Sequence, residues 1–382
     1  SDKIGFSSSH FLRHGAPTPT GNSPNPSSIH VRLTDTAQQA PYPACPALNA
    51  MSQWSMPPEW APHKATWMGF PTGAYETAGV SNDDVFDAWS AVANTISEHE
   101  SVHMLCHPDQ LSIARKKISS AVTIHALEID DAWLRDSGPT FVVNNDRLGG
   151  VDWVFNGWGD HTAFDWSHDA NIASEILRMT GAERRPSPLV NEGGGIAVNG
   201  EGDVLLTETV QLDPGRNPTA SKTSVEQEIH HQLGTERAVW FERGLWRDYQ
   251  NHGTRGHIDI VAAFVPDGSV LLHRQFDTSH PDSKLWQIQC RALEEAGFKV
   301  RALPAPRIAR DNVDWVDYSY VNHYVGNGFV LLPAFRDRTD EHAVEILKDL
   351  YPDRHVTNLD ARVLFAMGGG IHCITQQQPL VV

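Results

Sequence analysis

Apolar runs recur at a nearly constant interval in the second half of the chain. Val-Leu-Leu follows a polar turn in "GEGDVLL" (200–206), "PDGSVLL" (266–272) and "VGNGFVLL" (325–332). The three runs begin at 204, 270 and 330, and a spacing of about 60 residues is typical of a repeated supersecondary unit. A polar turn and an amphipathic segment follow each run, so each unit predicts a strand and then a helix.

Helical periodicity extends this pattern from Trp54 to the C-terminus. The predicted helices cover about 82–99, 167–181, 219–234, 281–297 and 340–350. Strand-like stretches follow the helices, among them "VHMLCH" (102–107), "AVWFE" (238–242) and "FKVRAL" (298–303). Alternating strands and helices predict an α/β fold. Five helix-centred units suggest a ring of repeats, and an ordinary open α/β sheet is the alternative that the pattern leaves open.

Residues 1–50 have a different composition. "APTPTGNSPNPSSIH" is rich in Pro, Ser, Thr and Asn and offers little apolar surface to bury. We predict a poorly ordered N-terminal extension over 1–50 and a single folded domain over 51–382. The extension lacks the apolar stretch of a secretory signal.

Charge and cysteine content narrow the range of partners. The net charge is −17, which disfavours nucleic acid and anionic membranes, and no apolar run is long enough to span a bilayer. The four cysteines form no CxxC pair, so we expect free thiols in a reducing, cytoplasmic compartment. No Cys/His spacing typical of zinc occurs. The sequence does not decide whether the protein forms a homo-oligomer.

Four stretches interrupt the periodic pattern with glycine, proline and ionisable residues. They are "DDAWLRDSGP" (130–139), "NEGGGIAV" (191–198), "GTRGHIDI" (253–260) and "GGGIHC" (368–373). Each joins turn residues to a strand-like run. Loops at strand ends are where a repeat fold brings polar groups together, so we expect these stretches to converge.

The residue types in these stretches suit one chemistry. Cys373 is the candidate nucleophile, and His257 is the candidate proton donor and acceptor. Asp136, Glu192 and Asp259 supply negative charge, and carboxylates hold a guanidinium through paired hydrogen bonds. A bound cation also favours the thiolate that attacks the guanidinium carbon. We therefore predict a small cationic guanidine substrate and a reaction that needs no cofactor and no metal.

Each stretch also has an ordinary structural explanation. A single cysteine is often buried without reacting, and "RDSGP" and "NEGGG" resemble common turns. His257 and Asp259 would share the outer face of a strand if 257–259 were extended. Only the combination of four such stretches favours a functional site.

The sequences of these stretches resemble those of the agmatine deiminases. This family belongs to the guanidino-modifying (pentein) superfamily, alongside the bacterial-type peptidylarginine deiminases. The matching segments are "MPPEWAPHKATWMGFP" (56–71), "DDAWLRDSGPTFVV" (130–143), "NEGGGIAVNGEGDVLLTE" (191–208), "GHIDIVAAF" (256–264), "SYVNHYVGNGFVLLPAF" (319–335) and "GGGIHCITQQQP" (368–379). The resemblance covers about residue 54 to the end, and the final motif is the most specific.

The resemblance implies a five-bladed α/β propeller of ββαβ units with its site on the central axis. It also implies hydrolysis of agmatine to N-carbamoylputrescine and ammonia through a Cys amidino-thioether, a step in polyamine and putrescine biosynthesis. By position, Cys373 matches the nucleophile and His257 the general acid/base. Asp136 and Asp259 match the guanidinium-binding acids. Glu192 matches the acid that holds the guanidinium and helps orient the histidine.

Two further positions concern the rest of the substrate. Trp133 matches an aromatic residue that lines the substrate channel. Arg255 stands where many relatives have an acid, two residues before the histidine. An Arg facing the pocket would repel the amine of agmatine and suit arginine or a guanidino acid, whereas an Arg paired with a local acid would do neither.

Several functions therefore remain open on the sequence. They are a deiminase of agmatine, a deiminase of arginine, peptidyl-arginine or a guanidino acid, and an amidinotransferase. A non-catalytic binding protein on the same propeller is less favoured, because the chain keeps the nucleophile, the histidine and all three acids.

Overall fold

The computed structural model describes residues 54–73, 80–160, 165–250, 253–311 and 314–381. These residues belong to one compact unit, Asn49–Val382. The extension over 1–50 lies outside the described residues, so its interpretation and the domain boundary stay predictions.

The described residues form five separate β-sheets, one for each predicted unit. The strands, in sheet order, are β16 (Thr375–Pro379), β1 (His63–Gly69), β2 (Val102–Cys106) and β3 (Thr123–Ala126); β4 (Thr140–Asn144), β5 (Arg147–Val154) and β6 (Glu183–Val190); β7 (Ala197–Val198), β8 (Asp203–Thr207) and β9 (Arg237–Phe241); β10 (Ala262–Phe264), β11 (Val270–Arg274) and β12 (Val300–Pro304); β13 (Tyr324–Gly326), β14 (Phe329–Ala334) and β15 (His355–Asp360). In each sheet the first two strands are antiparallel and the next pair is parallel.

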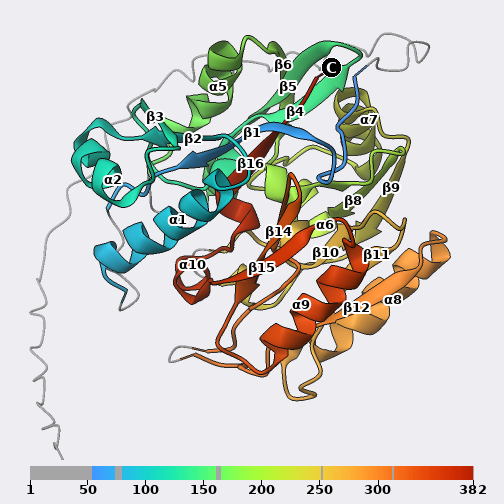
Figure 1. Cartoon of the computed structure of the whole chain (residues 1–382). Helices are drawn as coiled ribbons and strands as arrows, with labels where there is room; N and C mark the ends of the chain where they lie inside the picture. Colours follow the sequence, from blue (N-terminus) through green and yellow to red (C-terminus); the bar gives the residue numbers. More distant parts are fainter. Residues whose placement is uncertain (1–53, 74–79, 161–164, 251–252, 312–313, 382) are drawn as a thin grey trace, which may run out of the picture. The chain divides into compact units, whose positions relative to one another are not determined.

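One longer helix crosses between the parallel strands of each unit, as parallel pairing requires. These helices are α1 (Asn82–Ser97), α5 (Ile172–Thr180), α7 (Lys222–Leu233), α8 (Leu285–Glu295) and α9 (Thr339–Leu350). Figure 1 shows them distributed around the sheets. Short helices complete the unit: α2 (Leu111–Lys117), α3 (Leu134–Ser137), α4 (Gly157–Asp160), α6 (Glu208–Gln211) and α10 (Arg362–Ala366). Each unit is therefore a ββαβ repeat, and the predicted α/β fold class is confirmed.

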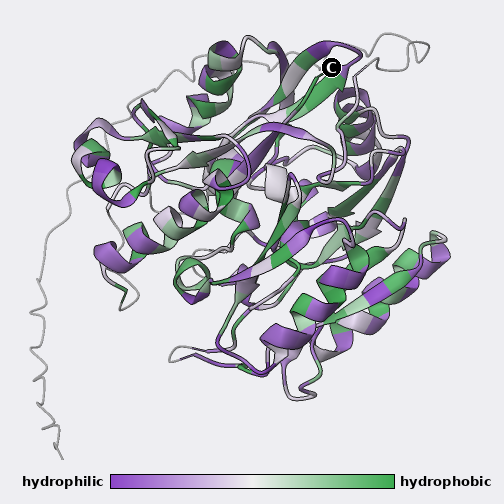
Figure 2. Cartoon of the chain, in the orientation of Figure 1, coloured by the Kyte–Doolittle hydropathy of each residue, from purple (hydrophilic) through white to green (hydrophobic). Residues whose placement is uncertain are grey.

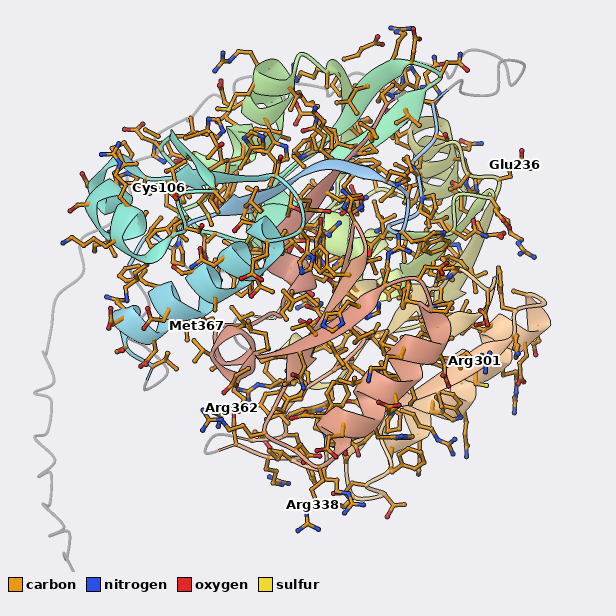
Figure 3. All side chains as sticks on the ribbon, viewed as in Figure 1. Cys106, Glu236, Arg301, Arg338, Arg362 and Met367 are labelled. Atoms are coloured by element: carbon orange, nitrogen blue, oxygen red, sulfur yellow. The ribbon has the colours of Figure 1, made fainter. Side chains whose placement is uncertain are left out.

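The Val-Leu-Leu runs form the second strands, β8, β11 and β14. Leu205, Leu271 and Leu331 are fully buried, because these strands are covered on both faces. Figure 2 shows the same layering, with green apolar residues on these strands and purple residues on the outer helix faces. The labelled charged side chains Glu236 and Arg338 extend outward in Figure 3.

The two ends of the described fold meet in one sheet. β16, close to the C-terminus, pairs antiparallel with β1, and Gln376 lies opposite Trp67. The first unit thus takes its first strand from the end of the chain. First strands of different units also lie side by side, β7 with β10 and β4 with β16. The alternative of a single open sheet is wrong, since the strands are divided among five sheets.

Candidate functional site

The predicted residues lie in equivalent places, in the turns that precede the first strands of the units. Asp136 lies in α3 before β4, and Glu192 precedes a 3-10 turn, Gly193–Gly195, before β7. His257 and Asp259 lie at a 3-10 turn, Ile258–Ile260, before β10. Cys373 lies in the turn His372–Ile374 before β16. α3 contacts the turns Gly193–Gly195 and His372–Ile374, and Gly193–Gly195 contacts Ile258–Ile260, so the turns converge as the motifs predicted.

Cys373 is buried and surrounded by polar groups. Its Sγ lies 3.4 Å from Asp259 Oδ2, to which the thiol donates, and 3.2 Å from the amide nitrogen of Asn322, which donates to the sulfur. Burial raises the pKa of the Cys373 thiol well above its usual range, and Asp259 and Asp136 raise it further. The surroundings of Cys373 thus favour its protonated form.

Asn322 is a site residue that the sequence interpretation missed. It is fully buried in the turn before β13, the one unit to which no candidate was assigned. Its carboxamide oxygen accepts a hydrogen bond from the backbone N–H of His372, which fixes the turn that carries Cys373. The repeat itself could have revealed it, because every other unit places a functional side chain at the same point.

His257 lies between two of the predicted acids. Its Nε2 is hydrogen-bonded to Glu192 Oε2 at 3.2 Å, and its Nδ1 lies 3.8 Å from Asp136 Oδ2. Burial alone would lower the pKa of His257, but the carboxylates of Asp136 and Glu192, with that of Asp259, raise it to about 9. The interpretation of 257–259 as an outward-facing strand is wrong, because the segment turns and both side chains are buried.

Glu192 is held by an arginine that the sequence interpretation also missed. Nε of Arg216 donates to both carboxylate oxygens of Glu192, at 2.9 and 3.0 Å, and both side chains are fully buried. Burial would raise the pKa of Glu192, but Arg216 and His257 lower it to about 2. The carboxylate is therefore charged and oriented, in a position to keep His257 protonated.

Asp136 is fixed by two donors. The backbone N–H of Gly194 donates to its Oδ1 and the indole N–H of Trp158 to its Oδ2, both at 3.0 Å. Burial raises the pKa of Asp136; His257 opposes this, and Asp259 raises it further. The carboxylate is thus oriented, and a bound cation would favour its charged form.

Asp259 and His257 each present a polar atom without a hydrogen-bond partner among the described residues. These atoms are Asp259 Oδ1 and His257 Nδ1, and both are buried. Burying a polar atom without a partner is costly, so these two atoms are candidates to bind a polar group of the substrate. An acceptor on a carboxylate beside Cys373 matches the N–H groups of a guanidinium.

The loop around His257 is organised by a buried acid, Asp248. Its carboxylate accepts hydrogen bonds from the backbone N–H groups of Thr254, Gly256 and His257. Arg255 adopts φ 71° in this loop, a conformation that L residues rarely take. The three hydrogen bonds to Asp248 stabilise the loop in this conformation.

The two residues predicted for the rest of the substrate have contrasting surroundings. Trp133 is buried, and a Cβ on Gly369 would touch both its ring and Cys373 Sγ, so the indole lies close to the thiol. The Arg255 side chain is 40% exposed, and its Nε lies 3.1 Å from Asp213 Oδ2. This ion pair accounts for Arg255 without a substrate, and its predicted binding role stays untested.

Comparison with known proteins agrees with this arrangement. A model of the Porphyromonas-type peptidyl-arginine deiminase family matches residues 55–379, which include every candidate residue. The chain belongs to this family. No helix among the described residues is long and apolar enough to cross a membrane.

Individual members of the family are similar over nearly their whole length. A Streptomyces coelicolor protein with the provisional name of agmatine deiminase is 49% identical over 338 residues, which are 85% of this chain and 98% of that protein. The solved agmatine deiminase of Enterococcus faecalis is 29% identical with a TM-score of 0.81, covering 86% of this chain and 97% of its own. A Porphyromonas gingivalis structure, provisionally described as an arginine deiminase, is 28% identical with a TM-score of 0.77, covering 85% of this chain and 98% of its own. The matched region thus contains every predicted site residue, and the roles of these residues stay predictions.

Proposed function

We propose that this protein hydrolyses agmatine to N-carbamoylputrescine and ammonia. The observation that carries the proposal is the buried thiol of Cys373 beside an unpartnered carboxylate oxygen of Asp259 and a protonated His257. A guanidinium would supply the N–H donors that Asp259 Oδ1 lacks. The similarity to the Enterococcus faecalis agmatine deiminase supports this substrate.

The first half of the reaction releases ammonia. The cationic guanidinium lies between Asp136 and Asp259 and lowers the pKa of Cys373, whose proton leaves to solvent. The thiolate attacks the guanidinium carbon, a C–S bond forms, and the C–N bond to one terminal nitrogen breaks. His257 gives its proton to that nitrogen, which departs as ammonia. A positively charged amidino-thioether remains on Cys373.

The second half releases the ureido product. Neutral His257 takes a proton from water, and the water oxygen adds to the thioether carbon. The C–S bond then breaks, the sulfur leaves with a proton from the intermediate, and N-carbamoylputrescine is freed. The thiol and protonated His257 are restored. Ammonia takes up one proton from solvent, which balances the proton that Cys373 released.

The surroundings of Arg255 support agmatine over arginine. Asp213 Oδ2 lies 3.1 Å from Arg255 Nε, and the same oxygen accepts a hydrogen bond from Arg216 at 2.9 Å. The negative charge of Asp213 beside Arg255 weakens the attraction of this guanidinium for a substrate carboxylate. Agmatine has no carboxylate, so its binding needs no free arginine. The chemistry also requires a free thiol, which agrees with the expected reducing, cytoplasmic location.

A ureido-product assay tests the proposal. Agmatine, arginine, a peptidyl-arginine and a short guanidino acid are supplied in parallel at equal concentration. We expect turnover of agmatine to exceed that of the others and Cys373→Ala to abolish it. Cys290→Ala is the matched control, since Cys290 is a second free thiol on α8 and should retain full activity. Sustained turnover by Cys373→Ala, or a preference for another guanidine, would contradict the proposal.

A further inference from the structure

The residue next to the nucleophile connects two carboxylates. His372 Nδ1 lies 2.9 Å from Asp259 Oδ2, and His372 Nε2 lies 2.6 Å from Glu59 Oε1. The His372 side chain is only 6% exposed, while that of Glu59 is 26% exposed. An imidazole with a carboxylate at each nitrogen is held in one orientation, and it carries a proton on both nitrogens.

The two carboxylate oxygens of Asp259 differ in their hydrogen-bond partners. Oδ2 serves His372 and the thiol of Cys373, whereas Oδ1 has no partner in the part of the chain that is described. The carboxylate cannot rotate without breaking the His372 bond. Oδ1 is therefore the oxygen left for an N–H group of the substrate.

We propose that the Glu59–His372 pair is a positioning device that keeps the Asp259 carboxylate charged and aimed at the guanidinium. This inference rests on the proposed deiminase function and extends it to two residues outside the predicted site. Neither residue touches the reacting carbon, so both act through Asp259. A histidine immediately before the nucleophile is well placed for this, because one short turn carries both side chains.

The carboxylates beside His372 favour its protonated form. Three charged residues surround it: Asp259 in the turn before β10, Glu59 in the segment before β1, and Arg135 in α3. Burial opposes the charge of His372, and Arg135 opposes it as well, yet the two carboxylates raise the pKa of His372. Burial raises the pKa of Asp259 while the hydrogen bond from His372 lowers it, and the net shift is downward.

Glu59 is in turn held charged. Burial alone would raise its pKa, but His372 and Arg135, whose Nη1 lies 3.7 Å away, lower it to about 2. His323 also faces Glu59 across the small cavity that both residues line with His372. The cavity offers a matched control, since His323 is bonded to Tyr320 and Tyr351 and not to Asp259.

Two substitutions at one position separate the two hydrogen bonds. In His372→Asn the amide nitrogen lies near the place of Nδ1 and can still donate to Asp259. In His372→Gln it lies near the place of Nε2 and reaches Glu59 instead. We expect His372→Gln to lose roughly 10- to 100-fold in kcat/KM for agmatine, because a bond to a charged acceptor is lost. His372→Asn should lose less than about tenfold, and His323→Asn should stay near the wild type.

The pH profile distinguishes positioning from a general structural defect. Without the His372 cation the pKa of Asp259 rises, so its carboxylate is protonated at higher pH. The acid limb of kcat/KM should therefore move to higher pH in His372→Gln and, by a smaller amount, in Glu59→Gln. Equal losses in His372→Asn and His372→Gln, an unshifted acid limb, or the same loss in His323→Asn would overturn the proposal.

A readout that needs no turnover separates this inference from the proposed function. Alkylation of Cys373 by iodoacetamide, followed by mass spectrometry across a pH series, reports formation of the thiolate. Losing the His372 cation leaves Asp259 uncompensated beside the thiol, so alkylation should need a higher pH in His372→Gln. Absence of wild-type turnover on agmatine would defeat the proposed function alone. An unchanged alkylation profile in His372→Gln would defeat the positioning role alone.

Discussion

The backbone of Gly194 lies directly against the imidazole of His257. A Cβ at this position would stand 2.5 Å from His257 Nδ1 and 2.9 Å from Asp136 Oδ1, closer than real Cβ atoms approach such neighbours. The middle glycine of "NEGGG" is therefore required by the packing of the site itself. It also donates its N–H to Asp136, so the same residue leaves room and fixes an acid.

Gly194→Ala should consequently lower kcat/KM by roughly 100-fold, because displacing catalytic groups by about 1 Å costs that much. Gly195→Ala is the control in the same turn. A Cβ there would meet only side-chain atoms at 3.2 Å or more, so its activity should fall far less. Steady-state kinetics on agmatine, together with thermal unfolding of both variants, measure this difference. Equal activity in the two variants would contradict the role of Gly194.

The pKa of His257 predicts the alkaline limit of activity. Since the imidazole gives a proton to departing ammonia, activity should fall as pH rises through about 9, where His257 loses that proton. Glu192→Gln removes one of the charges that raise this pKa, so its alkaline limb should move to lower pH. Initial rates between about pH 6 and 10.5 measure both profiles. An alkaline limb that Glu192→Gln leaves in place would contradict this assignment.

Arg216 should matter for stability as well as activity. Arg216→Met removes the guanidinium that holds the buried Glu192 carboxylate, which destabilises by about 3–5 kcal/mol. The folded-state pKa of Glu192, about 2, lies below its usual 4.5. Its stabilising contribution is therefore complete above pH 4.5 and is lost as pH falls towards 2. The variant should lack this part of the acid dependence.

Urea denaturation at several pH values measures the effect of Arg216→Met. Arg178→Met is the control, because Arg178 pairs with Glu175 on the exposed surface of α5 at 2.8 Å. Such surface pairs contribute less than about 1 kcal/mol. A loss in Arg216→Met no larger than that of Arg178→Met would show that the buried pair is not important for folding.

Arg255 provides a test of substrate choice. Because its guanidinium is engaged by Asp213, Arg255→Gln should leave the preference between agmatine and arginine within about threefold of the wild type, a change below 1 kcal/mol. Parallel kcat/KM values for the two substrates measure it. A selective loss of arginine turnover would instead mean that Arg255 binds the substrate carboxylate.

Much of the local structure followed from the sequence. The helix expected over 340–350 is α9, Thr339–Leu350, and the helix expected over 82–99 is α1, Asn82–Ser97. Hydrophobic periodicity within one element is a local property, so a single chain reports it. The same holds for the turns that carry Asp136 and Cys373, because glycine and ionisable residues interrupt the periodic pattern there.

Residues that act through distant partners were not found in this way. Arg216 is an ordinary residue of a polar loop until Glu192 is placed beside it, 24 positions away. His372 and Glu59 are separated by 313 positions, and no local pattern connects them. Asn322 was missed for a different reason, since an uncharged amide in the segment before β13 gives no local signal of a catalytic role.

The sequence by itself determined the repeated strand–helix units and the residue types available for chemistry, because both depend on short-range pattern. Only the tertiary structure decided that the units form five separate sheets and that β16 returns to pair with β1. That pairing joins residues more than 300 positions apart, and its stability comes from long-range contacts that no local window contains. The same pairing brings Cys373 to Asp259 and Asn322, and so the site exists only once β16 has joined β1.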